Sequence, residues 1–379
     1  MSAPAPTVKP WIDAIHPYVA GKAKLGDAPV IAKLSSNENP FGPSPRAIAA
    51  MQAVVAEGHR YPDPAATALR AALAEKHGID ADRIVCGTGS DELLHLLAGA
   101  FASVGDEVLY ARHSFIVYEL AARRVGATPV VAADDDYACD VDAMLAAVTS
   151  RTRLVYLANP NNPTGTQISG AEVRRLHAGL PADCLFAVDG AYAEFAEGDY
   201  VDGLDLAREF PNVVALRTFS KLHGLAAQRV GWAYGAPHVI DALNRIRGPF
   251  NVTTTGQAGA IAALTDKDWA DMVLRHTAQW RRWMASEIAA LGNAGLRAIP
   301  SAANFILIEF PETGPVTAAA ANAALLADGI IARYLAVQAM PRCLRVSVGT
   351  EAETRAAMAS LRRFVETATG RAGDKKDHV

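Results

Sequence analysis

Residues 213–235 read Val-Val-Ala-Leu-Arg-Thr-Phe-Ser-Lys-Leu-His-Gly-Leu-Ala-Ala-Gln-Arg-Val-Gly-Trp-Ala-Tyr-Gly. The apolar runs at 213–216 and from Val230 predict two buried strands. Between the two runs stand Thr218, Ser220, Lys221 and Arg229. Hydroxyls and a guanidinium suit a phosphate, because arginine offers a planar fork of donors. A lysine that is desolvated or beside other cations becomes a nucleophile towards carbonyls. A lone lysine after a strand is more often an ordinary surface residue. Lys221 is not alone, because two hydroxyls and an arginine stand near it.

The composition of the chain argues against several classes of function. The chain has 379 residues, 51% of them hydrophobic, which is enough for one large core and a smaller second one. The formal net charge of −4 and the lack of a basic block argue against nucleic acid as a main partner. The four scattered cysteines show no metal-type spacing and favour a reduced, cytoplasmic protein. An apolar signal core and a membrane-spanning run are both missing, so we expect a globular protein away from membranes.

The region from Arg83 to Tyr234 alternates short apolar runs with helical segments. Such a pattern predicts a mainly parallel sheet with helices on both faces, whose ligands bind beyond the carboxyl ends of the strands. The predicted strands cover residues 84–86, 107–110, 129–132, 154–158, 185–188, 213–216 and 230–234.

Small residues open the helix after the first of these strands. Residues 87–92 read Gly-Thr-Gly-Ser-Asp-Glu, and free N–H groups at such a helix start can hold an anion. Position 92 is glutamate where a dinucleotide fingerprint needs its third glycine. We therefore predict a helix cap at Ser90 or Asp91, with a phosphate beside it.

Polar residues follow two further predicted strands. Residues 159–165 read Asn-Pro-Asn-Asn-Pro-Thr-Gly, which at the least makes a turn. The strand at 185–188 ends in Asp189, with Tyr192 close behind. Because an unpaired buried charge is costly, Asp189 needs a partner, either as a helix N-cap or beside a cation such as a protonated ring nitrogen.

The order and spacing of seven motifs between Pro17 and Thr350 resemble the histidinol-phosphate aminotransferases, which are fold type I enzymes dependent on pyridoxal 5′-phosphate (PLP). The segments that carry the likeness include Pro-Tyr-x-x-Gly-Lys at 17–22, Ser-Asn-Glu-Asn-Pro-Phe-Gly-Pro at 36–43, Arg-Tyr-Pro-Asp at 60–63 and Cys-Leu-Arg-Val-Ser-Val-Gly-Thr at 343–350. The chain departs from the usual family pattern at Phe115, where tyrosine is frequent, and at His223. These two departures leave the exact substrate open.

The resemblance implies a role for each matching residue. Lys221 is the Schiff-base lysine, Asp189 the partner of the pyridine nitrogen, and Phe115 the aromatic that stacks on the ring. Asn162 and Tyr192 bind the ring oxygen. The phosphate is held by Gly89, Ser90, Asp91, Thr218, Ser220, Arg229 and, from the partner subunit of a homodimer, Tyr61. The substrate side chains are Tyr18, Asn39, Arg333 and Arg345, of which the two arginines bind a substrate anion.

The implied fold is the type I PLP-dependent transferase fold, a mainly parallel mixed sheet sandwiched by helices plus a smaller α+β domain. We expect an arm over residues 1–40 that joins the small domain, a large PLP-binding domain over 41–275, a small domain over 276–368 and a polar tail over 369–379. In the small domain, strands are expected at 305–310, 330–333 and 343–349, with helices over 316–328 and from Glu351.

The implied activity interconverts L-histidinol phosphate plus 2-oxoglutarate with imidazole-acetol phosphate plus L-glutamate. An aromatic amino acid aminotransferase of the same fold is the nearest alternative, and Phe115 leaves it open. A nucleotide-dependent dehydrogenase is a remote alternative that only the sheet pattern and Gly87-Thr88-Gly89 favour. A PLP-domain transcription regulator would need an N-terminal DNA-binding region, which the sequence lacks.

Overall fold

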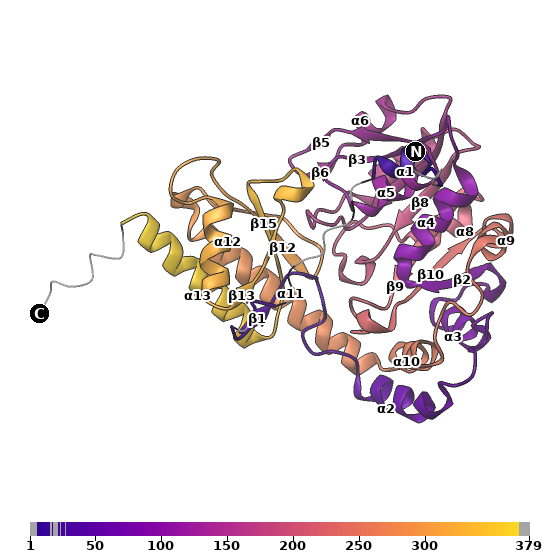
Figure 1. The fold of residues 1–379 in the computed structure, drawn as a ribbon, viewed down its shortest axis with the longest axis horizontal. Helices are drawn as coiled ribbons and strands as arrows, with labels where there is room; N and C mark the ends of the chain where they lie inside the picture. The colour runs from indigo at the N-terminus through magenta and orange to yellow at the C-terminus, as the bar shows by residue number, and fades with distance from the viewer. Residues whose placement is uncertain (1–5, 16, 18–21, 23, 27, 371–379) are drawn as a thin grey trace, which may run out of the picture.

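The computed structural model describes residues 6–15, 17, 22, 24–26 and 28–370. Two lobes lie side by side, a large one that holds most of the sheet and a small one built from the C-terminal third (Figure 1). The seven-stranded sheet of the large lobe has the order β2-β10-β9-β8-β7-β3-β4. Only β10 runs antiparallel to its neighbours, so the expected mainly parallel sheet is confirmed. Its strands are β2 (Ile84–Thr88), β3 (Glu107–Ala111), β4 (Thr128–Ala132), β7 (Thr152–Ala158), β8 (Leu185–Asp189), β9 (Val213–Thr218) and β10 (Val230–Gly235).

Helices cover both faces of this sheet, because successive apolar residues of its strands point to opposite sides. Leu154 and Leu185 join one core cluster, while the next residues, Val155 and Phe186, join the other. The first face carries α4 (Gly89–Phe101), α5 (Val117–Arg124) and α9 (Pro237–Ile246). The second face carries α2 (Pro45–Val54), α3 (Thr67–His77), α6 (Val141–Ala146), α7 (Gly170–Ala178), α8 (Gly203–Glu209) and α10 (Thr254–Thr265).

The small lobe is a four-stranded sheet of order β11-β12-β15-β14 with its own apolar core. The long helix α11 (Lys267–Ala289) leads from α10 into this lobe (Figure 1). A short N-terminal strand, β1 (Ala32–Lys33), pairs in parallel with β13 (Ile330–Ile331), which ties the start of the chain to the small lobe. The remaining elements are β11 (Arg297–Ile299), β12 (Phe305–Glu309), α12 (Ala318–Ala327), β14 (Arg333–Tyr334), β15 (Cys343–Ser347) and α13 (Glu351–Ala368).

Four details differ from the sequence-based expectations. The single strand expected over 330–333 is split, because β13 pairs with β1 whereas β14 pairs with β15. A short helix, α1 (Pro10–Asp13), and the edge strand β11 were not predicted. Nor was the hairpin of β5 (Asp134–Asp135) and β6 (Ala138–Cys139), whose strands are too short and polar to show a period.

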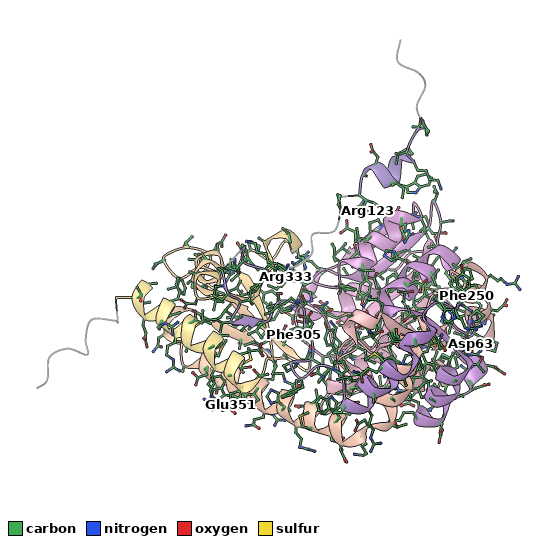
Figure 2. The ribbon with its side chains drawn as sticks, turned by 60° about the horizontal axis from the view of Figure 1, so that its bottom comes forward. Asp63, Arg123, Phe250, Phe305, Arg333 and Glu351 are labelled. Atoms are coloured by element: carbon green, nitrogen blue, oxygen red, sulfur yellow. The ribbon has the colours of Figure 1, made fainter. Side chains whose placement is uncertain are left out.

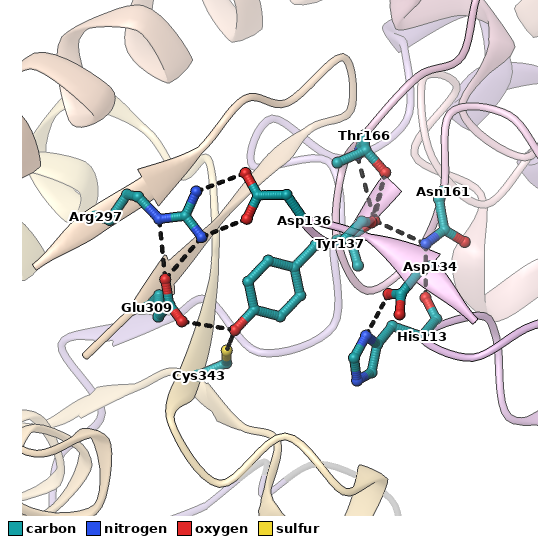
Figure 3. Close-up of polar contacts among 10 residues, drawn as sticks. His113, Asp134, Asp136, Tyr137, Asn161, Thr166, Arg297, Glu309 and Cys343 are labelled. Carbon is teal, nitrogen blue, oxygen red and sulfur yellow. Dashed lines mark hydrogen bonds and ion pairs between the residues drawn. The ribbon is translucent and has the colours of Figure 1, made fainter. Parts of the chain in front are cut away.

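This hairpin connects the two lobes. Arg297 of the small lobe forms a bidentate ion pair with Asp136 at the hairpin turn and also reaches Glu309 (Figure 3). Tyr137 donates to Glu309 at 2.9 Å and accepts from the Cys343 thiol at 3.5 Å. The lobes therefore meet through a polar network on one side. Across the described part of the chain, no helix has the length and apolar character that a membrane crossing requires.

Candidate active site

A cavity of about 510 Å³ lies where the carboxyl ends of β7, β8 and β9 face the small lobe. This is the edge at which parallel sheets bind their ligands. Both lobes contribute to its walls, and Phe305 and Arg333 lie at the junction between them (Figure 2). Of the residues predicted from the sequence, the cavity is lined by Ser90, Asp91, Phe115, Asn162, Asp189, Tyr192, Thr218, Ser220, Lys221, Arg229, Arg333 and Arg345.

Lys221 follows β9 on a tightly held loop. Its Nζ atom donates to the Ser36 carbonyl at 3.3 Å and lies 5.6 Å from the centroid of the Tyr192 ring. The loop is fixed from the N-terminal segment, because the Asn39 amide donates to the Leu222 carbonyl at 2.7 Å. Asn39 is not among the residues that line the cavity, and the predicted contact with substrate stays a prediction.

The start of α4 forms one end of the cavity, where Ser90 and Asp91 line it. The N-cap is Thr88, so the expectation that Ser90 or Asp91 caps this helix is wrong. Gly89 follows Thr88 with a positive φ of 78° and starts the helix two residues earlier than a cap at Ser90 would. The Thr88 hydroxyl donates to the Asn251 carbonyl. The Thr88 side chain does not cap the first turn, and the Glu92 carboxylate accepts from the Thr88 backbone N–H, which leaves N–H groups of the following residues for an external anion.

Arg229, which directly precedes β10, lies at the same end of the cavity. Its Nη1 atom donates to the Ser220 hydroxyl at 3.3 Å, and that hydroxyl accepts from Thr218 at 3.0 Å. A Cβ atom at Gly89 would lie 2.5 Å from Arg229 Nη2, so a side chain here would push the guanidinium aside, and the positive φ also favours glycine. Hydroxyls, helix N–H groups and a guanidinium thus converge, as a phosphate requires.

Asp189 lies at the buried end of the cavity and is 4% exposed. Its carboxylate accepts from the Tyr118 hydroxyl at 2.8 Å and from the Ala191 N–H at 3.0 Å. Burial raises the pKa of this carboxyl, although both hydrogen bonds oppose the shift. The nearby buried Arg217 forms an ion pair with Asp202 instead. A cationic group that enters the cavity would relieve the cost of this buried charge.

The two arginines of the small lobe stand directly opposite each other, since Arg333 of β14 is paired with Arg345 of β15. Each is 8% exposed, and both line the cavity. Arg345 donates to the Asn162 side chain and to the Ser35 carbonyl. Both side chains line the same cavity, and a guanidinium offers a planar fork of donors, so this pair suits a carboxylate or phosphate.

The sequence did not assign several residues that the structure brings to the site. Asn37 donates to the Tyr192 hydroxyl at 2.8 Å, and Tyr118 holds Asp189. Both stand inside segments of the N-terminal and aromatic motifs, but only the fold could show which side chain of each segment points inward. Ser35 and His95 also line the cavity. Tyr18 lies outside the described residues. Tyr61 is 82% exposed and does not line the cavity of its own chain.

Comparison with known proteins agrees with this geometry. Residues 29–361 match the family model described as "Aminotransferase class I and II". A histidinol-phosphate aminotransferase of Sphingopyxis alaskensis is 54% identical over 365 residues, which cover 95% of this chain and 98% of the relative. The same-named protein of Zymomonas mobilis is 53% identical, with 92% and 95% covered. The crystal structure of histidinol-phosphate aminotransferase from Sinorhizobium meliloti in complex with pyridoxal-5′-phosphate is similar, with a TM-score of 0.87 at 30% identity, and 95% and 98% of the two chains are covered.

Proposed function

The chain belongs to the class I and II aminotransferases, and from this premise we propose that it moves an amino group between L-histidinol phosphate and 2-oxoglutarate with the help of PLP. Membership of this family excludes the alternative of a nucleotide-dependent dehydrogenase. Glu92 stands where a dinucleotide-binding motif needs its third glycine, and its carboxylate accepts hydrogen bonds from Thr88 and Asn251. The observation that carries the proposal is the cavity in which Lys221, Asp189 and the two facing arginines meet.

The cavity fits PLP at each of its polar positions. The phosphate fits the start of α4 together with Thr218, Ser220 and Arg229, and the ring nitrogen fits Asp189, whose buried carboxylate favours a cation. Asn162 and Tyr192 would bind the ring oxygen, and Phe115 would cover the ring face. When bound, PLP supplies an electron sink for the charge left at the substrate carbon.

The protein's own contribution is to hold and move protons. Asp189 would keep a proton on the ring nitrogen of bound PLP, because a positive charge beside it stabilises a buried carboxylate. The Lys221 amine lies in the cavity, where it would hold PLP and could take up and return the proton of the substrate Cα. Such positioned acid–base catalysis contributes about 10²–10⁴-fold.

Substrate selection depends on the two arginines of the small lobe. Histidinol phosphate carries a phosphate and no α-carboxylate, whereas glutamate carries two carboxylates. Arg333 and Arg345 form one subsite that can bind either anion, since a guanidinium recognises phosphate and carboxylate with similar geometry. Asn162 lies against Arg345 and connects this subsite to the cofactor.

We further propose that the enzyme is a homodimer in which Tyr61 reaches the cofactor phosphate of the partner subunit. Tyr61 stacks on Phe250 with ring centroids 4.6 Å apart, and both rings are exposed. Phe250 and the neighbouring Asp63 lie at the far edge of the large lobe from the small lobe (Figure 2). Two exposed aromatic rings that stack are typical of a surface that another chain covers. Cytoplasmic localisation stays a prediction from the sequence.

Single-turnover spectroscopy of the PLP-loaded protein tests the proposed function. Histidinol phosphate should discharge the visible absorbance of the lysine-bound cofactor far more efficiently than phenylalanine does. Efficient reaction with phenylalanine and little with histidinol phosphate would assign the chain to aromatic amino acids instead. A protein that binds no PLP at Lys221 would contradict both assignments.

A further inference from the structure

A chain of buried hydrogen bonds runs from the small lobe to Tyr192. The Ser347 hydroxyl donates to Asn37 Oδ1 at 3.0 Å, and Asn37 Nδ2 donates to the Tyr192 hydroxyl at 2.8 Å. The three side chains are 2%, 1% and 3% exposed. Ser347 lies two positions after Arg345 on β15, so the chain begins on the strand that carries the substrate-binding arginine.

The direction of this chain follows from the chemistry of its members. The Asn37 backbone N–H donates to the Ser347 oxygen at 2.9 Å, which leaves the Ser347 proton for Asn37 Oδ1. The amide oxygen is therefore occupied as an acceptor, and the amide N–H group must face Tyr192. Because the Tyr192 oxygen accepts that bond, its own proton remains for a third partner. Tyr192 lines the cavity, so that partner is a ligand in it.

The backbone of Asn37 holds the amide in place. Its φ is 54°, in the left-handed region that asparagine and aspartate tolerate better than other side chains. Asn304 donates to the Asn37 carbonyl at 3.0 Å, which fixes the peptide from the other side. Rotation of the Asn37 side-chain amide would break its hydrogen bonds with Ser347 and Tyr192.

We propose that Asn37 and Ser347 are positioning residues that force Tyr192 to donate its proton into the cavity. The inference rests on the proposed function, since the recipient is the negatively charged ring oxygen of the cofactor. Asn37→Asp tests it, because aspartate suits the same backbone and can only accept, so Tyr192 would donate to the new carboxylate instead. The other charged groups that line this cavity are Glu38, Asp91, Asp189, Lys221, Arg229, Arg333 and Arg345.

The readout is the pH midpoint of the visible absorbance change of the PLP-loaded protein. A donor to the ring oxygen stabilises its charged form, so removal of the donor raises the midpoint. Asn37→Asp should raise it by about one to two pH units, the equivalent of one hydrogen bond to a charged group. Tyr192→Phe should raise it similarly, and Asn37→Asp should add little in the Tyr192→Phe background.

The double variant separates positioning from the field of a new charge. An equal shift by Asn37→Asp in both backgrounds would mean that the added charge acts directly, and the proposal would be wrong. An unchanged midpoint in the single variant would overturn it as well. Ser347→Ala, which frees the amide to turn, should give a smaller shift that also vanishes without the Tyr192 hydroxyl. Absence of the visible band in the wild-type protein would refute the proposed function itself.

Discussion

Replacement of Asp189 by asparagine should stabilise the cofactor-free protein and damage the loaded one. The carboxylate is buried, burial raises its pKa, and it accepts two hydrogen bonds. Asparagine can keep both bonds, with Oδ1 accepting from Ala191 and the amide N–H donating to the Tyr118 oxygen. Removing the charge saves several kcal/mol of desolvation per ion, and weakening two charge-assisted bonds costs about 1–3 kcal/mol. We expect a net gain of about 1–3 kcal/mol, or a few degrees in Tm.

The stability gain of the cofactor-free Asp189→Asn variant should also depend on pH. The folded-state pKa of Asp189 lies above its unfolded value, so below the unfolded value the aspartate costs nothing. Its cost grows as the pH rises towards the folded-state pKa and is constant above it. The advantage of the Asp189→Asn variant in scanning calorimetry of the cofactor-free protein should follow the same course. PLP should then raise Tm less for the variant than for the wild type.

Loss of one partner of a buried ion pair costs about 3–5 kcal/mol, so kcat/KM of the loaded variant should fall about a hundredfold or more. Tyr118→Phe is the matched control. It removes a hydrogen bond to the carboxylate in the wild type and a neutral hydrogen bond to the amide in the variant, so it should destabilise the wild-type background more. If the cofactor-free variant melted below the wild type at neutral pH, or gained as much from PLP, Asp189 would not be the partner of the ring nitrogen.

Further predictions concern other parts of the site. Lys221→Ala should abolish turnover and the visible band, and an active variant would refute the assignment. Arg345→Ala should weaken both half-reactions in stopped-flow measurements, whereas damage to only one would exclude a shared anion subsite. In a mixed dimer of Tyr61→Phe and Lys221→Ala chains, one of the two sites should keep both residues, and PLP titration should resolve it as the tighter site. Arg297→Ala removes the exposed ion pairs with Asp136 and Glu309 between the lobes. It should lower the free energy of unfolding in urea by no more than about 1 kcal/mol.

Much of the fold could be predicted because its strands are continuous apolar runs. A strand buried on both faces needs no alternation, and β7, β8 and β9 each show such a run followed at once by polar residues. Parallel strands bring their carboxyl ends to one edge, so Asn162, Asp189 and Lys221 could be grouped from the sequence alone. The short elements β11 and β5–β6 could not, since two or three residues show no period.

The rest of the site depends on contacts that no local pattern encodes. Asn37 and Ser347 are 310 positions apart, and their hydrogen bond follows from the packing of the N-terminal segment on β15. The cap at Thr88 lies two residues before the expected Ser90, because the positive φ of Gly89 lets the helix begin beside Arg229. The opposition of Arg333 and Arg345 likewise depends on strand register, which the sequence of either strand does not specify.

The facing arginines explain why the site needs two lobes. Both guanidinium groups belong to the small lobe and line the cavity, so under the proposed function the small lobe supplies the anion subsite and the large lobe the cofactor site. The same segment that supplies Ser35 to Arg345 supplies Ser36 to Lys221 and Asn37 to Tyr192. Its backbone therefore connects the anion subsite with the lysine and the tyrosine over three consecutive residues. A substrate whose anion reaches the arginines thus binds at a fixed position relative to the groups that move its proton, so selection of the anion and placement for chemistry are the same structural event.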